Sequence, residues 1–145
     1  MDFAVDSNLL VYIANELSPF HLISIGTVED LVSRDKVLCV FPQNLIEFWT
    51  TATRPTSVNG LGLSITEARN EIKKFKEIFH VLEESAAIYP EWERLVVAHK
   101  VSGKNVHDAR IVAQMNVHNM SNILTFNAKD FSRYSDINAI EPASV

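Results

Sequence analysis

Short apolar runs alternate with helical patterns along this chain, and this alternation constrains the fold more than any other feature. Each run ends abruptly at a polar residue or a proline, which is typical of a buried strand. The segments between the runs carry apolar residues three or four positions apart, the period of an amphipathic helix. We expect strands at 3–5, 36–42, 79–84, 122–126 and 137–142.

Helical segments between these strands have recognisable start and stop signals. Ser64 and Glu67 form a capping-box pattern. Pro55 ends one helix, and Pro90 begins another. The expected helices span about 8–15, 19–34, 43–54, 64–79, 90–103 and 105–119, with a loop at 55–64. Strands that alternate with helices predict an α/β fold, in which helices cover both faces of a parallel sheet.

Composition narrows the class of protein further. The 145 residues suit one domain, 1–145, and 47% of them are hydrophobic, which excludes a disordered chain. The 18 acidic residues exceed the 13 basic ones, which argues against nucleic-acid binding driven by net charge alone. An enzyme whose acids hold metal ions in one cleft remains compatible with this balance, as does a basic partner.

The single cysteine and the lengths of the apolar runs indicate the cellular compartment in which the protein is expected. Cys39 lies in the apolar run VLCVF, where we expect a buried side chain rather than a reactive or paired one. No basic start with a following apolar stretch resembles a signal peptide, and no run approaches the roughly 20 residues of a membrane helix. We therefore expect a cytoplasmic protein without membrane contact.

Four acids occupy positions that a parallel sheet would bring together. Asp6 follows the first strand, and Glu47 lies in the first turns of the helix after the second strand. Asp108 lies at the start of the helix before the fourth strand, and Asp130 follows that strand. Because ligands of open parallel sheets bind beyond the carboxyl ends of the strands, this pattern predicts one acidic site.

Each acid alone also has a structural explanation. Asp6 could cap a helix, Glu47 could be solvated, and Asp108 suits a helix start electrostatically. Together, however, clustered carboxylates raise each other's pKa, and a divalent cation removes that penalty. Oxygen ligands without a cysteine or histidine set favour Mg²⁺ or Mn²⁺ over zinc. The polar segment 6–8 could also cap the helix that follows it. We expect that cap from Ser7 or Asn8 rather than from the metal-facing Asp6.

Four segments together resemble one known family. They read VDSNLLVYIAN, NLIEFWTTATRP, VHDARIVAQM and ILTFNAKDF, and they span nearly the whole chain. In this order and spacing they resemble the PIN-domain ribonucleases, specifically the VapC-type toxins of type II toxin–antitoxin systems. A D-x-N motif after a first strand is weak alone, whereas the four segments together are specific.

The resemblance implies a fold, a metal site and a cofactor. The fold would be a three-layer sandwich with a five-stranded parallel sheet between helices. Asp6, Glu47 and Asp108 would be the catalytic acids and would bind Mg²⁺ or Mn²⁺. The family often has a fourth acid after the fourth strand. Here Asn127 stands where many relatives carry Asp, so either Asp130 or Asn127 would complete the metal site.

The resemblance also implies supporting residues and an activity. Thr125 and Asn8 would position a ligand or a water molecule. Arg110 is a candidate phosphate contact, with an ion pair as the alternative interpretation. The activity would be metal-dependent hydrolysis of RNA phosphodiester bonds.

The implied partners are an RNA substrate and a cognate antitoxin, in a homodimer or a toxin–antitoxin hetero-oligomer. Phe20 would lie either in the antitoxin groove or in the core. A basic stretch is read as a solvated helix face, with RNA contact as the alternative; it comprises Arg69, Lys73, Lys74 and Lys76.

Two further interpretations come from other functional classes. A binding module could have kept the PIN fold without catalysis, but such a module is expected to have lost acids that this chain retains. A haloacid-dehalogenase-like phosphatase also places an aspartate after its first strand. Such an enzyme usually has a second Asp two residues later, where this chain has Asn8.

Overall fold

The computed structural model describes residues 2–145 as five strands, six α-helices and three short 3₁₀ helices. The strands are β1 (Asp2–Val5), β2 (Val37–Val40), β3 (His80–Val81), β4 (Asn122–Leu124) and β5 (Asn138–Ile140). The helices are α1 (Ser7–Ala14), α2 (His21–Ser33), α3 (Pro42–Thr53), α4 (Ile65–Ile78), α5 (Ile88–Ala98) and α6 (Asn105–Val117). The 3₁₀ helices are η1 (Thr56–Val58), η2 (Ala128–Phe131) and η3 (Pro142–Ser144).

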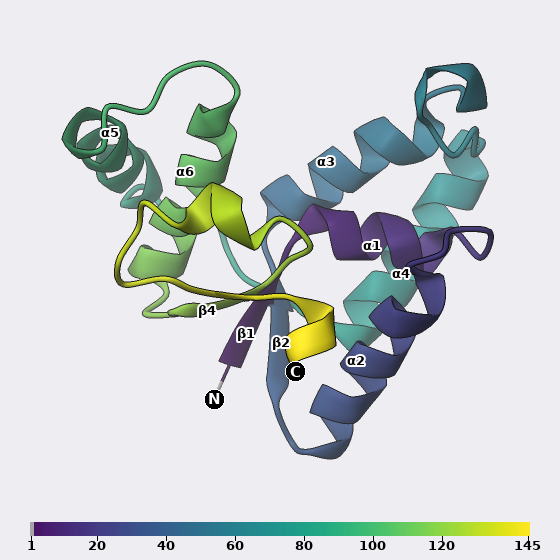
Figure 1. The fold of residues 1–145 in the computed structure, drawn as a ribbon. Helices are drawn as coiled ribbons and strands as arrows, with labels where there is room; N and C mark the ends of the chain where they lie inside the picture. Colours follow the sequence, from purple (N-terminus) through teal and green to yellow (C-terminus); the bar gives the residue numbers. More distant parts are fainter. Residues whose placement is uncertain (1) are drawn as a thin grey trace.

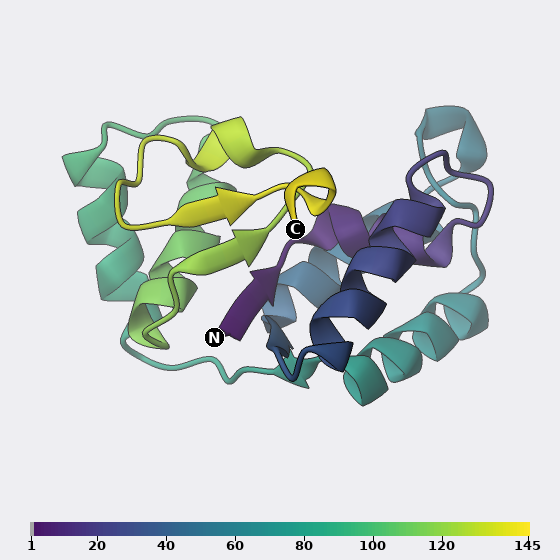
Figure 2. The ribbon, with the colours of Figure 1, turned by 60° about the horizontal axis from the view of Figure 1, so that its bottom comes forward.

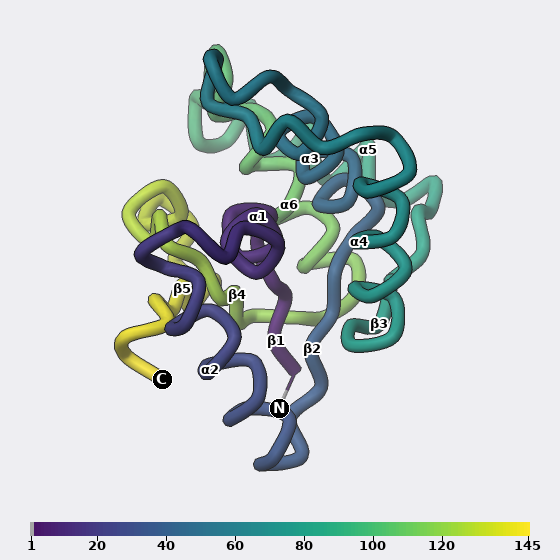
Figure 3. The backbone as a smooth tube through the Cα atoms, turned by 90° about the vertical axis from the view of Figure 1, so that its right-hand side faces the viewer, coloured from purple at the N-terminus to yellow at the C-terminus, as the bar shows by residue number. Residues whose placement is uncertain are grey.

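The five strands form one parallel sheet in the order β3-β2-β1-β4-β5 (Figure 3). The central strand β1 pairs on both sides, and its Ala4 lies opposite Cys39 of β2 and Ile123 of β4. The carboxyl ends of β1, β2 and β4 therefore meet at one edge of the sheet. The expected five-stranded parallel sheet is confirmed.

Helices cover both faces of the sheet, as expected for a three-layer sandwich (Figures 1 and 2). Alternate strand residues point to opposite faces because successive side chains of a strand do so. Phe3, Val5 and Leu38 pack with α1, α2, α3 and α4. Ala4 and Cys39 pack on the other face, with α5 and α6. Two hydrophobic cores therefore lie one on each side of the sheet.

The third strand is shorter than the 79–84 predicted from its apolar pattern. Phe79 is buried at the end of α4, and β3 contains only His80 and Val81. The Leu82 N–H still donates to the Val40 carbonyl at 2.9 Å. Beyond it the chain leaves the sheet, because β3 is an edge strand with no neighbour on its outer side.

The fifth helix begins earlier and ends earlier than its sequence signals indicate. It starts at Ile88, so Pro90 occupies its third position rather than its first. A proline is tolerated there because the first N–H groups of a helix have no partner within it. The helix ends at Ala98 because Lys100 adopts the left-handed conformation that often terminates helices.

The second helix also starts later than the predicted Pro19. It begins at His21, because Ser18 forms a local turn in which its Oγ accepts the Phe20 N–H at 3.1 Å.

Within residues 2–145, none of the helices combines the length and apolar character needed to cross a membrane. Cys39 is buried, as expected, and its burial raises the pKa of the thiol to about 11, so the thiol stays protonated at neutral pH.

The loop after α3 folds back onto the end of that helix. Its N–H groups at Leu61, Gly62 and Leu63 donate to the carbonyls of Thr51, Arg54 and Ala52, respectively, at 2.8–3.0 Å. These bonds satisfy carbonyls that have no partner within the helix. The loop can approach so closely only because Gly60 has no side chain: a Cβ there would lie 1.8 Å from the Arg54 carbonyl oxygen.

Replacing Gly60 tests this close approach. We expect Gly60→Ala to lower the free energy of unfolding by about 1–3 kcal/mol, because the added methyl group overlaps the backbone of Arg54. Gly26→Ala is the matched control, since no atom lies within 4 Å of its Cβ position in α2. That control should gain about 1 kcal/mol from helix propensity. Equal stability changes in urea denaturation would contradict the packing argument.

Candidate active site

Asp6 follows the carboxyl end of the central strand β1 and directly precedes α1. Its backbone N–H donates to the Leu124 carbonyl of β4 at 3.0 Å, which continues the sheet by one residue. Its Oδ1 accepts the Ser7 N–H at 2.8 Å, so Asp6 itself is the N-cap of α1. The expectation that Ser7 or Asn8 provides the cap is therefore wrong, because the strand ends one residue before Asp6 and leaves it in the capping position.

Thr125 holds the second oxygen of the Asp6 carboxylate. It is fully buried after β4, and its Oγ1 donates to Asp6 Oδ2 at 2.7 Å. The same Oγ1 accepts Asn8 Nδ2 at 3.3 Å and the Asn127 N–H at 3.0 Å. Asn8 Oδ1 in turn accepts the Phe126 N–H at 3.4 Å. These bonds tie the start of α1 to the segment after β4, and they orient Asp6.

Burial dominates the electrostatics of Asp6. The residue is only 8% exposed, and desolvation raises the pKa of its carboxyl above the usual range. The bonds from Thr125 and Ser7 oppose this increase, and the negative charge of Asp130 adds to it. None of the described lysines or arginines pairs with the Asp6 carboxylate, which is the arrangement expected of a ligand-binding carboxylate.

Glu47 faces Asp6 from α3. The Ser7 Oγ donates to Glu47 Oε1 at 3.3 Å, which joins the first residue of α1 to the acid of the neighbouring helix. Burial raises the pKa of Glu47, and the charge of Asp6 raises it further. Hydrogen bonds with Gln43 and Ser7 lower it. The predicted proximity of Glu47 to Asp6 is thus present in the structure.

Asp108 approaches the same place from the first turn of α6. Its pKa is raised to about 6 by burial and by the charges of Asp6, Asp130 and Glu47. Because all three other acids contribute to this increase, the four carboxyl groups share one electrostatic neighbourhood. They are carried by four different parts of the chain, which meet only at the carboxyl edge of the sheet.

The segment after β4 contributes one acid and one amide. Asp130 lies in η2, is exposed, and raises the pKa of both Asp6 and Asp108 through its charge. Asn127 caps η2 and joins the site through its backbone N–H, which donates to Thr125. Asp130 therefore supplies the negative charge at this end of the cluster.

Among the described residues, none of the four acids forms an ion pair with a lysine or arginine, although the charge of His107 lowers the pKa of Glu47 and Asp108. Every ion pair between described residues involves another acid: Asp30, Glu71, Glu84 or Glu91. No three Asp, Glu, His or Cys side chains of residues 2–145 lie close enough together to coordinate one ion. The four acids thus share one electrostatic neighbourhood without forming a ready three-ligand site, and their carboxylate oxygens are the kind of donor that Mg²⁺ and Mn²⁺ prefer.

A pocket of about 280 Å³ opens beside Glu47. It lies between α1 and α3, and its lining comprises Ser7, Asn8, Val11, Tyr12, Glu47 and Thr51. Tyr12 also packs against Phe20 and Phe126, with ring centroids about 5 Å apart. Phe20 is 45% exposed, so it lies at the rim of this aromatic cluster rather than in the core.

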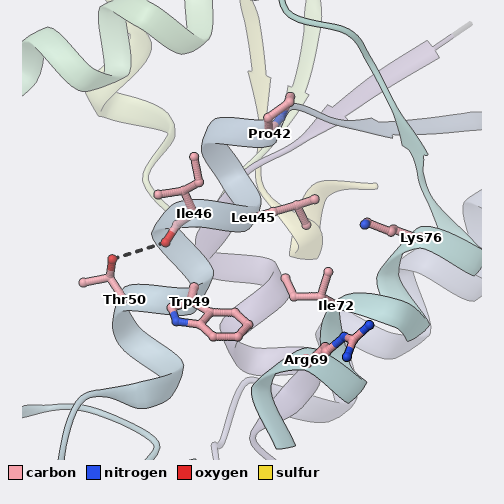
Figure 4. A pocket seen from close by; sticks show the side chains of 8 residues that line it. All are labelled: Pro42, Leu45, Ile46, Trp49, Thr50, Arg69, Ile72 and Lys76. Carbon is pink, nitrogen blue, oxygen red and sulfur yellow. Dashed lines mark hydrogen bonds between the residues drawn. The ribbon is translucent and has the colours of Figure 1, made fainter. Parts of the chain in front are cut away.

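The basic residues selected from the sequence are engaged elsewhere or solvated. Arg110 pairs with Glu84 at 2.8 Å, which is the structural alternative to a phosphate contact. The basic stretch on α4 is exposed, in agreement with a solvated helix face. Arg69 and Lys76 flank an apolar pocket of about 460 Å³ between α3 and α4, and its lining includes none of the four acids (Figure 4).

Ser7 and Gln43 are two site residues that the sequence interpretation missed as contacts. Ser7 donates to Glu47, and Gln43 Nε2 donates to the His107 carbonyl next to Asp108 at 2.9 Å. Gln43 precedes Glu47 by four residues, and this spacing places both on one face of a helix. That spacing was a usable signal for Gln43. No comparable signal connects Ser7 to Glu47, 40 residues away.

Asp108 provides a test of the repulsion within the cluster. Its pKa is near 3.9 in an unfolded chain and about 6 in the fold, so its contribution to stability falls as pH rises from about 4 to 6. The full pKa difference corresponds to about 3 kcal/mol, but solvent screens the charge of this partly exposed group. We therefore expect the free energy of unfolding of Asp108→Asn to exceed that of wild type by about 1 kcal/mol at pH 7.5, with the gain disappearing near pH 4. Asp30→Asn, which removes an exposed acid paired with Arg34, is the control. A pH-independent difference would contradict the argument.

Comparisons with known proteins were made for both sequence and structure. A search of curated protein sequences finds no significant match. Among solved structures, VapBC2 from Rickettsia felis, bound to a DNA fragment from its promoter, matches with a TM-score of 0.72 and 14% identity, covering 97% of this chain and 98% of that one. VapBC-1 from nontypeable Haemophilus influenzae matches with a TM-score of 0.72 and 17% identity, covering 99% of both chains.

A third similar structure is VapC20 from Mycobacterium tuberculosis, described as a toxin that cleaves the sarcin–ricin loop. It matches with a TM-score of 0.68 and 16% identity, covering 91% of this chain and 95% of that one. At these identities the structures share the fold. The sequence model of the PIN domain family matches residues 3–137, nearly the whole chain. The chain therefore belongs to the PIN domain family.

Proposed function

We propose that this protein is a metal-dependent endoribonuclease and the toxin of a toxin–antitoxin pair. One observation carries the proposal: four carboxylates that pair with no lysine or arginine among the described residues share one electrostatic neighbourhood at the carboxyl edge of a PIN-domain sheet. Their mutual repulsion costs stability in the absence of a cation. A site that accepts this cost is suited to bind a divalent ion.

Asp6, Glu47 and Asp108 would hold Mg²⁺ or Mn²⁺, and Asp130 would complete the site from η2. When bound, such an ion supplies positive charge for the phosphate oxygens and lowers the pKa of the attacking water. The acids would hold and orient the ion, and one of their oxygens would accept a proton from a water molecule. Thr125, Asn8 and Ser7 would act through the acids they contact.

Two other functions receive less support. A binding module without catalysis would not need an acidic cluster that destabilises the fold, and this chain retains Asp6, Glu47 and Asp108. A haloacid-dehalogenase-like phosphatase would need a second acid near Asp6 to move a proton. Asn8 stands there, and both ends of its amide are engaged with Thr125 and Phe126.

The similar structures support the assignment to a toxin–antitoxin system. VapBC2, VapBC-1 and a toxin–antitoxin complex from Klebsiella pneumoniae share this fold. We therefore assign an antitoxin as the protein partner and RNA as the substrate. The assembly would be a homodimer or a toxin–antitoxin hetero-oligomer. Growth arrest by this protein, relieved when the product of the adjacent gene is co-expressed, tests the partner.

Asp6→Asn tests the nuclease. We expect the variant to lose at least 100-fold in RNA cleavage and to abolish growth arrest, because it removes one charge from the metal site. The Asn oxygen can still accept the Ser7 N–H, so the fold should persist in circular dichroism. The measurement is the sequencing of RNA 5′ ends after induction of either protein. An unchanged set of 5′ ends in the variant would refute the assignment.

Metal binding can be measured without RNA. We expect Mg²⁺ at about 100 times its dissociation constant to stabilise the wild-type fold by about 2.7 kcal/mol. Asp108→Asn should show a much smaller gain in the same thermal unfolding experiment, because it retains fewer charged ligands. An equal Mg²⁺ gain in both proteins would place the ion outside the acidic cluster.

A further inference from the structure

Gln43 connects the two helices that carry Glu47 and Asp108. It is the second residue of α3 and is only 8% exposed. Its Nε2 donates to the backbone carbonyl of His107 at 2.9 Å. His107 directly precedes Asp108 in the first turn of α6. This hydrogen bond therefore links the helix that carries Glu47 to the residue directly before Asp108.

This connection matters because α3 and α6 belong to opposite layers of the sandwich (Figure 1). Phe48 and Ala52 of α3 pack in one core, whereas Ile111 and Met115 of α6 pack in the other. No shared hydrophobic core fixes the distance between the two helix starts.

The amide of Gln43 is held in one orientation. Its Oε1 accepts Gln114 Nε2 at 2.9 Å and Arg110 Nη1 at 3.2 Å. Both of these partners are donors at the contacting atoms, whereas the His107 carbonyl accepts only. A flipped amide would place donor against donor and oxygen against oxygen. The network thus specifies which end of Gln43 faces α6.

The network is costly for the fold, which argues that it has a use. Gln114 is fully buried in α6, and its Oε1 has no hydrogen-bond partner among the described residues. An unpaired buried polar atom destabilises a protein by about 1–3 kcal/mol. Arg110 is also kept from other roles, since Glu84 holds its guanidinium at 2.8 Å. Apolar side chains would pack these positions at lower cost.

We propose that Gln43 is a positioning residue that sets the separation of Glu47 and Asp108 and thereby the affinity of the acidic cluster for Mg²⁺ or Mn²⁺. The inference rests on the proposed function, because it concerns the same metal site. Without the bonds from Gln43 to α6, the two helix starts are free to move apart, and part of the binding free energy of the ion is spent in bringing them together. Outer partners of metal ligands typically contribute about 10- to 100-fold in affinity.

The test compares Gln43→Met with Asn116→Leu. The first substitution removes the hydrogen bonds of the Gln43 side chain to α6, at nearly constant side-chain volume. The second removes a part-buried amide of α6 that donates to Glu91 at 2.8 Å, and it leaves the bonds of Gln43 intact. Isothermal titration calorimetry with Mn²⁺ and with Mg²⁺ measures affinity without any substrate. Thermal unfolding without metal verifies that each variant is folded.

We expect Gln43→Met to weaken metal binding about 10- to 100-fold and Asn116→Leu to weaken it less than about 3-fold. RNA cleavage by Gln43→Met should return towards the wild-type rate at saturating Mg²⁺, because the acids themselves are unchanged. Wild-type affinity in Gln43→Met overturns the inference, and so does equal weakening in both variants.

Two further outcomes remain informative. Should Gln43→Met not fold, Gln43→Asn keeps the amide but shortens the side chain by one methylene, and wild-type metal affinity in that variant overturns the inference. Should the wild-type protein bind neither Mn²⁺ nor Mg²⁺, the proposed metal site itself is refuted. The failure of the positioning role and the failure of the proposed function are thereby distinguished.

Discussion

Repulsion among four carboxylates at one edge of a parallel sheet is the constraint on which the rest of this structure depends. The pKa of Asp108 is raised by the charges of the other three acids, and burial raises the pKa of Asp6 and Glu47. Such a cluster persists only if neutral groups hold each acid in place. Thr125 and the Ser7 N–H do this for Asp6, and the Ser7 hydroxyl does it for Glu47.

The supporting groups come from elements that the sheet brings together. The Asp6 N–H extends the ladder to β4, and Thr125 continues that strand, so backbone pairing and the Thr125–Asp6 bond reinforce each other. The loop after α3 satisfies the last carbonyls of the helix that carries Glu47. On the other face of the sheet, α6 delivers Asp108 from a separate core. Gln43 is the residue that spans the two layers at this edge.

Much of the fold followed from local patterns. The strand and helix periods are visible because buried strands and amphipathic helices require them, and the parallel sheet follows from their alternation. The positions of Asp6, Glu47 and Asp108 at strand ends and helix starts were enough to predict that they would converge. The length of β3 and the start of α5 were misjudged. Strand β3 is short because it lies at the edge of the sheet. Helix α5 starts before Pro90 because a proline is tolerated in the first turn of a helix.

The sequence by itself determined the α/β class, the order of the elements and the acids that meet at the edge of the sheet, because these depend on periodicity and on chain position. Only the tertiary structure decided which side chains contact those acids. Ser7 with Glu47, Thr125 with Asp6 and Gln43 with His107 are pairs separated by at least 40 residues. Such contacts depend on how the strands pair and the layers pack, and no local pattern in the chain encodes them.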